Sequence, residues 1–239
     1  MGHEYLRENL QKKRVKVSRY GKYGTLIDPF ELTPYDISDQ EFRSVHKGVI
    51  DSMAQKSGLI CLSKTRKSPA MWAHYAKNHT GACLEFEVTF DHIFEVQYVS
   101  EKLFKGINID TYRSHVNIEN IKVIYGTKSK DWAYEKEYRM SVPLDNPLVV
   151  RENNLHFMPF QRKTDNTFQL KRIWVGYRFE LGISNIMDDV EKYRHEVEVI
   201  QTRPAFESFS VVEQVNKQFW NMDPRNDAPL LPAEKAFFS

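Results

Sequence analysis

The stretch MWAHYAKNHTGACLEF (71–86) decides the expected fold, because it contains a helix pattern followed by a strand pattern. Pro69 just before it is typical of the first position of a helix, and Gly81 is typical of a helix C-terminus. The next residues, ACLEFEV (82–88), alternate between apolar and acidic side chains, as a strand with one buried face does. A helix over 69–79 and a strand over 82–88 are therefore predicted.

Helical and strand-like patterns also alternate along the rest of the chain. They predict helices over 3–13, 39–55 and 183–194, and strands over 15–19, 58–63, 94–99, 121–126, 136–142, 147–151, 172–179 and 196–202. This order indicates an α+β fold: a single domain over residues 1–220 with a central mixed or antiparallel sheet flanked by helices. Residues 221–239 are rich in Pro, Asp and Asn and are expected to form an extended C-terminal arm.

The bulk composition narrows the class of protein. A net charge of +2 gives no reason to expect a surface that binds duplex nucleic acid. No apolar run approaches the roughly 18 residues that a membrane helix needs, and we see no secretory signal, so a cytoplasmic protein without a membrane partner is expected. Cys61 and Cys83 each lie in an apolar, strand-like run, which favours buried thiols over a disulfide.

The segment KDWAYEKEYR (130–139) concentrates charged and aromatic side chains. If it is extended, Glu135, Glu137 and Arg139 share one face. Two carboxylates this close repel each other, so the pKa of one should rise unless a neighbouring cation offsets the charge. Such a pair can hold a cationic or hydroxyl-bearing substrate and transfer protons. A solvated strand face, or a short helix with Glu135 and Arg139 one turn apart, is the structural alternative.

The expected helix 69–79 carries a second set of candidates. Trp72 and Tyr75 would supply flat aromatic surfaces, and His74 or His79 a hydrogen bond or a proton. The same spacing fits a core-facing aromatic helix whose histidines are structural. The two histidines are not spaced to place both imidazoles on one helix face, so no metal site is predicted. Any chemistry is expected where residues 71–86 meet residues 130–139.

Taken together, these motifs resemble an uncharacterised bacterial family, domain of unknown function 2971. The resemblance runs from about residue 4 to residue 212 and rests on IDPFE (27–31), CLSKT (61–65), MWAHYAKNHTG (71–81), TKSKDWAYEKEYR (127–139) and RIWVGYRF (172–179). One departure is Ile27, where the family usually has Asn. The family carries no assigned activity, so the function must come from the site itself.

The order of the candidates is also similar to that in ADP-ribosyltransferases, which use an early Arg or His, then a Ser or Tyr, then a late Glu-x-Glu. This resemblance implies NAD as the substrate, with Glu135 and Glu137 as catalytic residues at the ribose. The residues expected to bind the substrate are Arg19, Asp28, Ser63, Trp72, His74, Tyr75, Trp132 and Arg139. Transfer to an acceptor macromolecule, or to water as in an NAD glycohydrolase, would suit a bacterial toxin or a phage-defence effector with a protein partner.

Three alternatives stay open at this stage. A metal-dependent nuclease would gather Asp28, Glu31, Glu135 and Glu137 around a divalent ion. A binding module without turnover would use the aromatic side chains Trp72, Tyr75, Trp132 and Tyr138. Both motifs could also serve only the packing of the fold.

Overall fold

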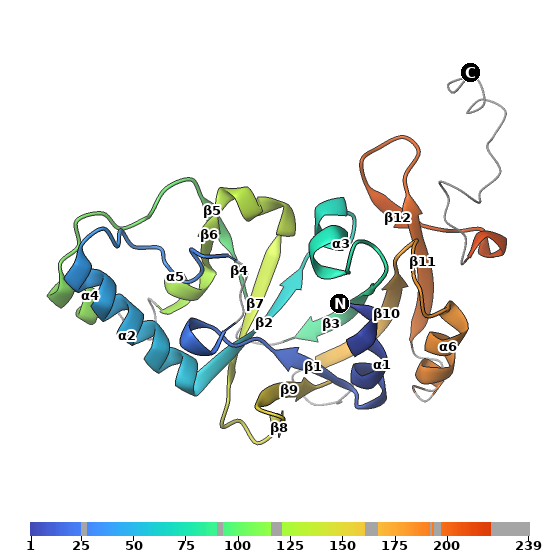
Figure 1. Cartoon of the computed structure of the whole chain (residues 1–239), viewed down its shortest axis with the longest axis horizontal. Coiled ribbons are helices and arrows are strands. Elements are labelled where there is room, and N and C mark those ends of the chain that lie inside the picture. Colours follow the sequence, from blue (N-terminus) through green and yellow to red (C-terminus); the bar gives the residue numbers. More distant parts are fainter. Residues whose placement is uncertain are drawn as a thin grey trace. The chain divides into compact units, whose positions relative to one another are not determined.

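The chain divides into two compact units, each assembled from separate stretches of sequence (Figure 1). Unit 1 contains Met1–Lys13, Arg66–Val88 and Phe168–Ser239, and unit 2 contains Arg14–Thr65 and Thr89–Thr167. The computed structural model describes residues 1–24, 28–89, 93–115, 121–160, 167–191, 193 and 197–220. The expected arm over 221–239 lies outside these residues, and the single-domain boundary at residue 220 stays a prediction.

Unit 1 is built on a four-stranded sheet with the order β12-β11-β10-β3. The strands are β3 (Ala82–Thr89), β10 (Thr167–Val175), β11 (Glu198–Pro204) and β12 (Val211–Glu213). β10 and β11 run parallel, whereas β11 and β12 are antiparallel. The helices of this unit are α1 (His3–Gln11), α3 (Pro69–Tyr75), α6 (Ile183–Glu191) and the short 3-10 helix η3 (Lys217–Phe219).

Helix α3 begins where the sequence predicted and ends four residues earlier. The Ser68 side chain accepts a hydrogen bond from the Met71 N–H, as an N-cap does. The chain leaves the helix after Tyr75 because residues 77–79 all adopt the left-handed conformation. The following turn packs closely on Gly176, where a Cβ atom would lie 1.8 Å from the His79 carbonyl oxygen. Only glycine fits there, which explains the Gly of the RIWVGYRF segment.

Unit 2 contains three small sheets. The first has the order β2-β7-β4 and is antiparallel, the second has the order β1-β9-β8, and the third is the parallel pair β5-β6. The strands are β1 (Arg14–Val17), β2 (Ser57–Ser63), β4 (Ile93–Glu95), β5 (Gln97–Val99), β6 (Thr127–Ser129), β7 (Glu137–Pro143), β8 (Val150–Glu152) and β9 (Leu155–Pro159). The helices are η1 (Gly21–Tyr23), α2 (Gln40–Lys56), α4 (Ile109–His115), α5 (Ile121–Gly126) and η2 (Lys130–Glu135).

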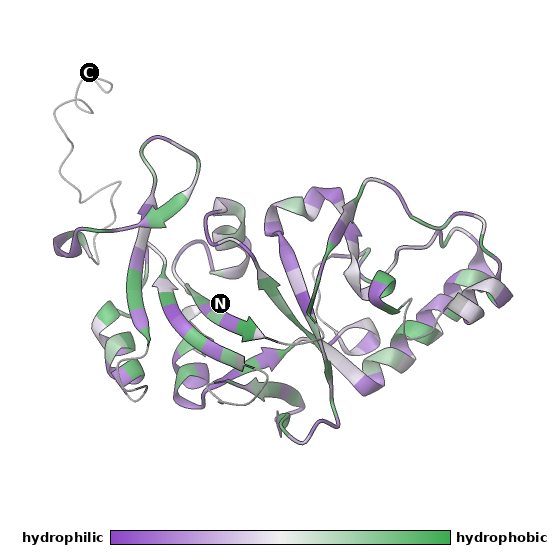
Figure 2. Ribbon diagram, turned by 180° about the vertical axis from the view of Figure 1, so that it is seen from behind, coloured by the Kyte–Doolittle hydropathy of each residue, from purple (hydrophilic) through white to green (hydrophobic). Residues whose placement is uncertain are grey.

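Helices and mixed or antiparallel sheets together confirm the α+β class. Hydrophilic and hydrophobic residues alternate along many of the strands, which is the pattern that made them predictable (Figure 2). The expected strand over 121–126 is wrong, because this segment is helix α5. Its buried residues Ile124, Tyr125 and Gly126 form one turn, and such a short apolar run fits either a helix or a strand. Among the described residues, no helix has both the length and the apolar content needed to cross a membrane.

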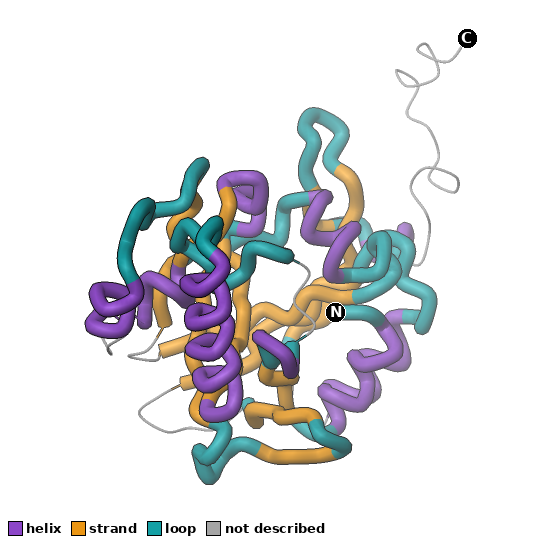
Figure 3. Tube along the Cα trace, turned by 60° about the vertical axis from the view of Figure 1, so that its left-hand side comes forward, coloured by secondary structure: helices purple, strands orange, loops and turns teal. Residues whose placement is uncertain are grey.

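Helix α2 covers the β2 side of unit 2 with an aromatic core (Figure 3). Phe42, Ile50 and Ala54 of α2 pack with Leu59 of β2 in one cluster of buried residues. His46 is 4 % exposed in the same core, and its Nδ1 atom lies 2.7 Å from the Tyr112 hydroxyl. Desolvation lowers the pKa of His46 to about 4, so its imidazole is neutral at physiological pH.

His46 should make unit 2 less stable in mild acid. Between pH 6.5 and about pH 4, His46 binds a proton in the unfolded chain but stays neutral in the folded one. The free energy of unfolding therefore falls as the pH falls. Allowing for solvent screening, we expect a loss of roughly 2 kcal/mol across this window. His46→Gln should flatten the dependence in urea unfolding, whereas His74→Gln should not. An unchanged slope in His46→Gln would contradict the assignment.

Candidate functional site

A cluster of five buried ionisable side chains lies inside unit 2. We call Glu31, Lys128, Glu135, Glu137 and Arg139 the ion cluster; their side chains are between 1 % and 9 % exposed. Charged residues are almost never buried to this degree unless they are paired. The cluster is therefore the strongest functional candidate that unit 2 presents.

The chain brings these side chains together from four local structures. Strand β7 places Glu137 and Arg139 two residues apart, hence on one face of the sheet. Strand β6 supplies Lys128. Glu135 ends helix η2, and Lys136 then turns the chain with a left-handed φ of 46°. The strand predicted over 136–142 is confirmed from Glu137 onward, and Glu135 reaches the cluster through this turn instead of from an extended segment.

Glu31 enters the cluster from a turn that the Asp-Pro-Phe-Glu motif forms. The Asp28 side chain accepts a hydrogen bond from the Phe30 N–H at 2.9 Å, and the Glu31 N–H donates to the Asp28 carbonyl at 3.2 Å. Aspartate commonly closes such a turn with its own side chain. This local geometry fixes the direction in which the Glu31 side chain leaves the backbone.

Arg139 is the centre of the ion cluster and is only 1 % exposed. Its Nε and Nη2 atoms donate to the two carboxylate oxygens of Glu137 at 2.8 and 2.9 Å, which is a bidentate pair. Its Nη1 atom lies 2.5 Å from Glu31 Oε1 and donates to the Tyr125 carbonyl at 2.7 Å. All three guanidinium nitrogens therefore have an acceptor within the protein.

Lys128 joins the same carboxylates from the other side. Its Nζ atom lies 2.5 Å from Glu135 Oε2, 3.2 Å from Glu137 Oε2 and 4.0 Å from Glu31 Oε2. The ammonium group also lies 4.8 Å from the centre of the Trp132 ring, within the range of a cation–π contact. Because these carboxylates, Glu137 foremost, raise the pKa of Lys128 against the effect of desolvation, this lysine stays protonated.

The charges of the ion cluster do not balance if every group is ionised, because three carboxylates face two cations. Desolvation raises the pKa of Glu31, and its contacts with Arg139 offset this only in part. Desolvation also acts on Glu137, but hydrogen bonds and charge from Arg139 outweigh it and lower the pKa of Glu137. Glu137 is thus kept ionised, whereas Glu31 holds a proton more readily than Glu137 does.

Strand β2 places two reactive side chains beside the ion cluster. In the β2–β7 register Cys61 is opposite Arg139 and Ser63 is opposite Glu137, so all four side chains leave the same face. The Ser63 hydroxyl donates to the Glu135 carbonyl at 2.6 Å. Cys61 retains accessible surface, although the atoms crowded around it and the nearby Glu137 charge raise the pKa of its thiol. The expectation of a buried Cys61 is therefore wrong, because this face of β2 carries polar groups near its end.

Five of the predicted site residues come together in unit 2: Ser63, Trp132, Glu135, Glu137 and Arg139. Asp28 lies in the turn that presents Glu31. The sequence interpretation missed Lys128 and Tyr98, whose hydroxyl accepts the Glu137 N–H at 2.8 Å, and gave Glu31 only a metal-binding role. Lys128 lies seven residues before Glu135, and no local spacing rule connects these two positions.

Arg19 does not join this group. Its guanidinium donates to the Ala54 carbonyl and lies 4.9 Å from the centre of the Tyr23 ring. Ser18 bridges to Leu59 in antiparallel fashion, so Arg19 and Ser63 lie on opposite sides of that bridge. With about 3.3 Å per strand residue, they are separated by about 17 Å along the strands. Arg19 therefore does not lie beside Ser63 and Glu137, and its role in substrate binding stays a prediction.

The predicted aromatic candidates of α3 belong to unit 1. Trp72 is 2 % exposed and its indole N–H donates to the Arg66 carbonyl at 2.7 Å, so it serves the core. Tyr75 is 38 % exposed, and the His74 ring lies 6.3 Å from it. Both side chains are exposed on unit 1, and the predicted meeting of residues 71–86 with residues 130–139 stays a prediction.

Three of the four carboxylates that a nuclease would need, Glu31, Glu135 and Glu137, do converge. They surround the side chains of Lys128 and Arg139. Lys128 Nζ lies among Glu31, Glu135 and Glu137, where a divalent ion would have to bind. Within the described residues, no group of three or more His, Cys, Asp or Glu side chains could hold a metal ion. The donor set of the ion cluster therefore does not suit a metal-dependent nuclease.

Residues 71–140 match the model of a family described as protein of unknown function, DUF2971. The predicted family resemblance is confirmed. The match covers 70 of the 239 residues and includes four members of the ion cluster; Glu31, Cys61 and Ser63 precede it. No curated protein and no solved structure matches the chain. The match to DUF2971 therefore supplies no activity, and none of the comparisons shows similarity to ADP-ribosyltransferases.

Removing the central guanidinium should unfold unit 2 more readily. Arg139→Met would leave Glu31 and Glu137 buried without their main partner, and breaking such a pair costs about 3–5 kcal/mol. Urea unfolding followed by circular dichroism measures the loss. Arg172→Met is the matched control, because Arg172 also contacts two glutamates, Glu85 and Glu198, but at an exposed site where the expected cost is below about 1 kcal/mol. Equal losses in the two variants would contradict the central role of Arg139.

The Cys61 thiol should react slowly despite its accessibility. Only the thiolate is nucleophilic, and the raised pKa keeps Cys61 protonated at pH 8. In a Cys83→Ala background, the pH at which iodoacetamide labelling reaches half its maximal rate should lie well above the usual thiol pKa of about 8.5. Glu137→Gln should lower that pH by removing a negative charge. Labelling with an ordinary midpoint would show that the surroundings of Cys61 are not as crowded as the structure indicates.

Proposed function

We propose that the chain is an NAD-cleaving enzyme of the ADP-ribosyltransferase type, with Glu137 as the carboxylate that faces the ribose. The observation that carries the proposal is the β2–β7 register, which sets Ser63 directly opposite Glu137. The turn at Lys136 adds the second glutamate of the Glu-x-Glu motif to the same group. A hydroxyl and two carboxylates side by side suit a substrate that presents ribose hydroxyls.

The charge state of Glu137 matches the needs of this reaction. Nicotinamide leaves as a neutral molecule, so the step needs little general acid, but positive charge develops on the ribose. An ionised carboxylate placed there stabilises the transition state. Arg139 and Lys128 lower the pKa of Glu137 and keep it ionised near neutral pH. The two cations also hold the carboxylate in one orientation, which is the kind of preorganisation that electrostatic catalysis requires.

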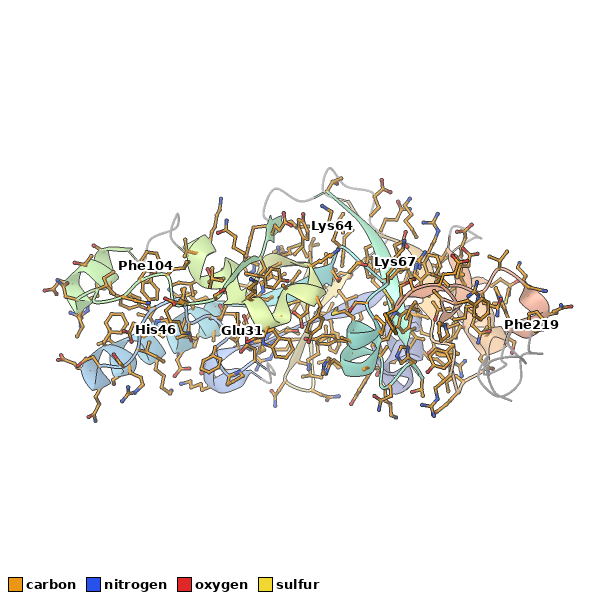
Figure 4. The ribbon with its side chains drawn as sticks, turned by 90° about the horizontal axis from the view of Figure 1, so that it is seen from above. Glu31, His46, Lys64, Lys67, Phe104 and Phe219 are labelled. Atoms are coloured by element: carbon orange, nitrogen blue, oxygen red, sulfur yellow. The ribbon has the colours of Figure 1, made fainter. Side chains whose placement is uncertain are left out.

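Neighbouring side chains can serve the rest of the substrate. Lys64, which Figure 4 labels, follows Ser63 and is exposed. Its backbone N–H donates to the Lys136 carbonyl at 3.0 Å, so these two exposed lysines are neighbours along the backbone. Two such cations suit a diphosphate. Trp132 is half-buried beside Lys128 and offers an aromatic surface for a planar ring. In this proposal Trp132 contacts the substrate and Arg139 holds Glu137 in place, whereas Arg19 has no role.

Exposure limits how the substrate can reach the site. Glu137 is only 5 % exposed, while Cys61 and Ser63 on the adjacent strand are accessible. Ribose hydroxyls would therefore approach along β2 and contact Ser63 first. The acceptor, and a role as a bacterial toxin or phage-defence effector, stay predictions that rest on analogy.

Nicotinamide release tests the proposal directly. Incubation of the full chain with NAD should liberate nicotinamide, measured by chromatography, and Glu137→Gln should reduce the rate by about 100-fold or more. Ser63→Ala, at an exposed position, should reduce it by about 10-fold. Glu101→Gln is the control, because Glu101 is an exposed carboxylate of the same unit that pairs with Lys105.

The outcomes separate the proposal from a structural ion cluster. Loss of nicotinamide release in Ser63→Ala and Glu137→Gln, with melting of Ser63→Ala unchanged, supports catalysis. No release from NAD by the unmodified chain, with or without a crude acceptor extract, would overturn the proposal. Binding of NAD without release would favour the binding-module alternative.

A further inference from the structure

A second feature of unit 2 is a recess of about 310 Å³ between α2 and the turns that precede it. Small-molecule sites begin at about this size. The wall includes groups from the Asp28–Glu31 turn, from α2 and from η1: Lys22, Asp28, Glu31, Arg43, His46 and Lys47. Glu31 and His46 are labelled in Figure 4.

Asp28 places an unpaired acceptor in the wall of this recess. The side chain is 5 % exposed, and its Oδ1 atom accepts the Phe30 N–H, but its Oδ2 atom is buried without any hydrogen-bond partner. The nearby Lys102 feels the charge of Asp28, yet its ammonium donates to the Thr33 carbonyl instead. A buried carboxylate oxygen without a donor is costly, so this position calls for an O–H or N–H group from a ligand.

Basic side chains line the same recess from exposed positions. Arg43 and Lys47 are one helical turn apart on α2, and Lys22 belongs to η1; all three are exposed. Asp51, which also lines the recess, lies 2.6 Å from the Lys47 Nζ atom and accepts the backbone N–H of Lys22 at 2.8 Å. Arg43 donates to two backbone carbonyls, those of residues 37 and 38. The recess therefore offers basic side chains on its α2 and η1 side beside the acidic ones.

We propose that this recess binds a sugar phosphate, whose hydroxyls donate to Asp28 Oδ2 and Glu31 while its phosphate contacts Lys22, Arg43 and Lys47. A simple cation would leave the basic side chains without a partner, and a bare anion would leave Asp28 unsatisfied, so a ligand with hydroxyls at one end and negative charge at the other fits best. The imidazole of His46, which also lines the recess, is neutral, so it contributes a polar group without adding charge. The inference does not depend on NAD cleavage, because it concerns binding alone.

Calorimetric titration of the full chain with ribose 5-phosphate tests the site. Asp28→Asn keeps an oxygen for the Phe30 N–H but removes the carboxylate charge, and it should weaken binding by about 10-fold or more. Lys47→Met should weaken ribose 5-phosphate by a similar factor and leave the weak binding of plain ribose unchanged. Inorganic phosphate should bind more weakly than ribose 5-phosphate and should be insensitive to Asp28→Asn.

Two matched controls keep the test specific. Asp36 makes the same turn hydrogen bond, to the Ser38 N–H, outside the recess, so Asp36→Asn should leave affinity unchanged. Lys105→Met breaks the exposed Lys105–Glu101 pair, which has the same spacing as Lys47–Asp51, and should also have no effect. The melting temperature of every control and test variant is measured, so that a loss of affinity is not confused with a loss of folded protein.

A second titration identifies the source of the sugar phosphate. Adenosine 5′-monophosphate binding at least as tightly as ribose 5-phosphate supports a nucleotide, and weaker binding supports a free sugar phosphate. No binding of either at millimolar concentration would overturn the inference. Equal losses in Asp28→Asn and Asp36→Asn, or phosphate binding as tightly as ribose 5-phosphate, would overturn it as well.

Discussion

The burial of Arg139 is the constraint on which the rest of unit 2 depends. A guanidinium cannot give up its proton, so every nitrogen needs an acceptor inside the protein. Glu137, Glu31 and the Tyr125 carbonyl meet that need; they come from a strand, a turn and a helix, and the turn with Glu31 is more than 100 residues away in sequence. These elements must converge for Arg139 to be buried at all. The ion cluster therefore fixes how β7, α5 and the Asp28–Glu31 turn are arranged around it.

Stability alone gives little reason for such a cluster. The cost of removing five ionisable groups from water is only partly repaid by their mutual attraction, and well-packed apolar residues would often serve as well. What apolar residues could not supply is an ionised carboxylate held in one orientation next to Ser63. The proton that would offset the surplus negative charge also has a definite location, because Glu31 is a carboxyl group whose pKa is raised. The cluster thus combines a fixed anion with a group that can take up a proton.

The sequence predicted what local periodicity controls. The α+β class, the N-terminus of α3 and the shared face of Glu137 and Arg139 all follow from short-range patterns. The contribution of Glu135 depends on one left-handed residue, Lys136, which no periodicity signals. Glu31 and Arg139 are more than 100 positions apart, and their contact depends on tertiary packing. The distance of Arg19 from Ser63 likewise follows from the bridge between Ser18 and Leu59, which the order of residues along the chain does not reveal.

Glu31 belongs to both of the features that distinguish unit 2. Its carboxylate contacts Arg139 in the ion cluster, and the same residue lines the recess beside Asp28. A ligand hydroxyl that donates to Glu31 would stabilise its ionised form and so restore the surplus negative charge of the cluster. A neutral Glu31 would instead leave the two cations and the two other carboxylates in balance. Occupancy of the recess and the charge around Glu137 are therefore coupled through a single side chain, by electrostatics and without any movement of the backbone.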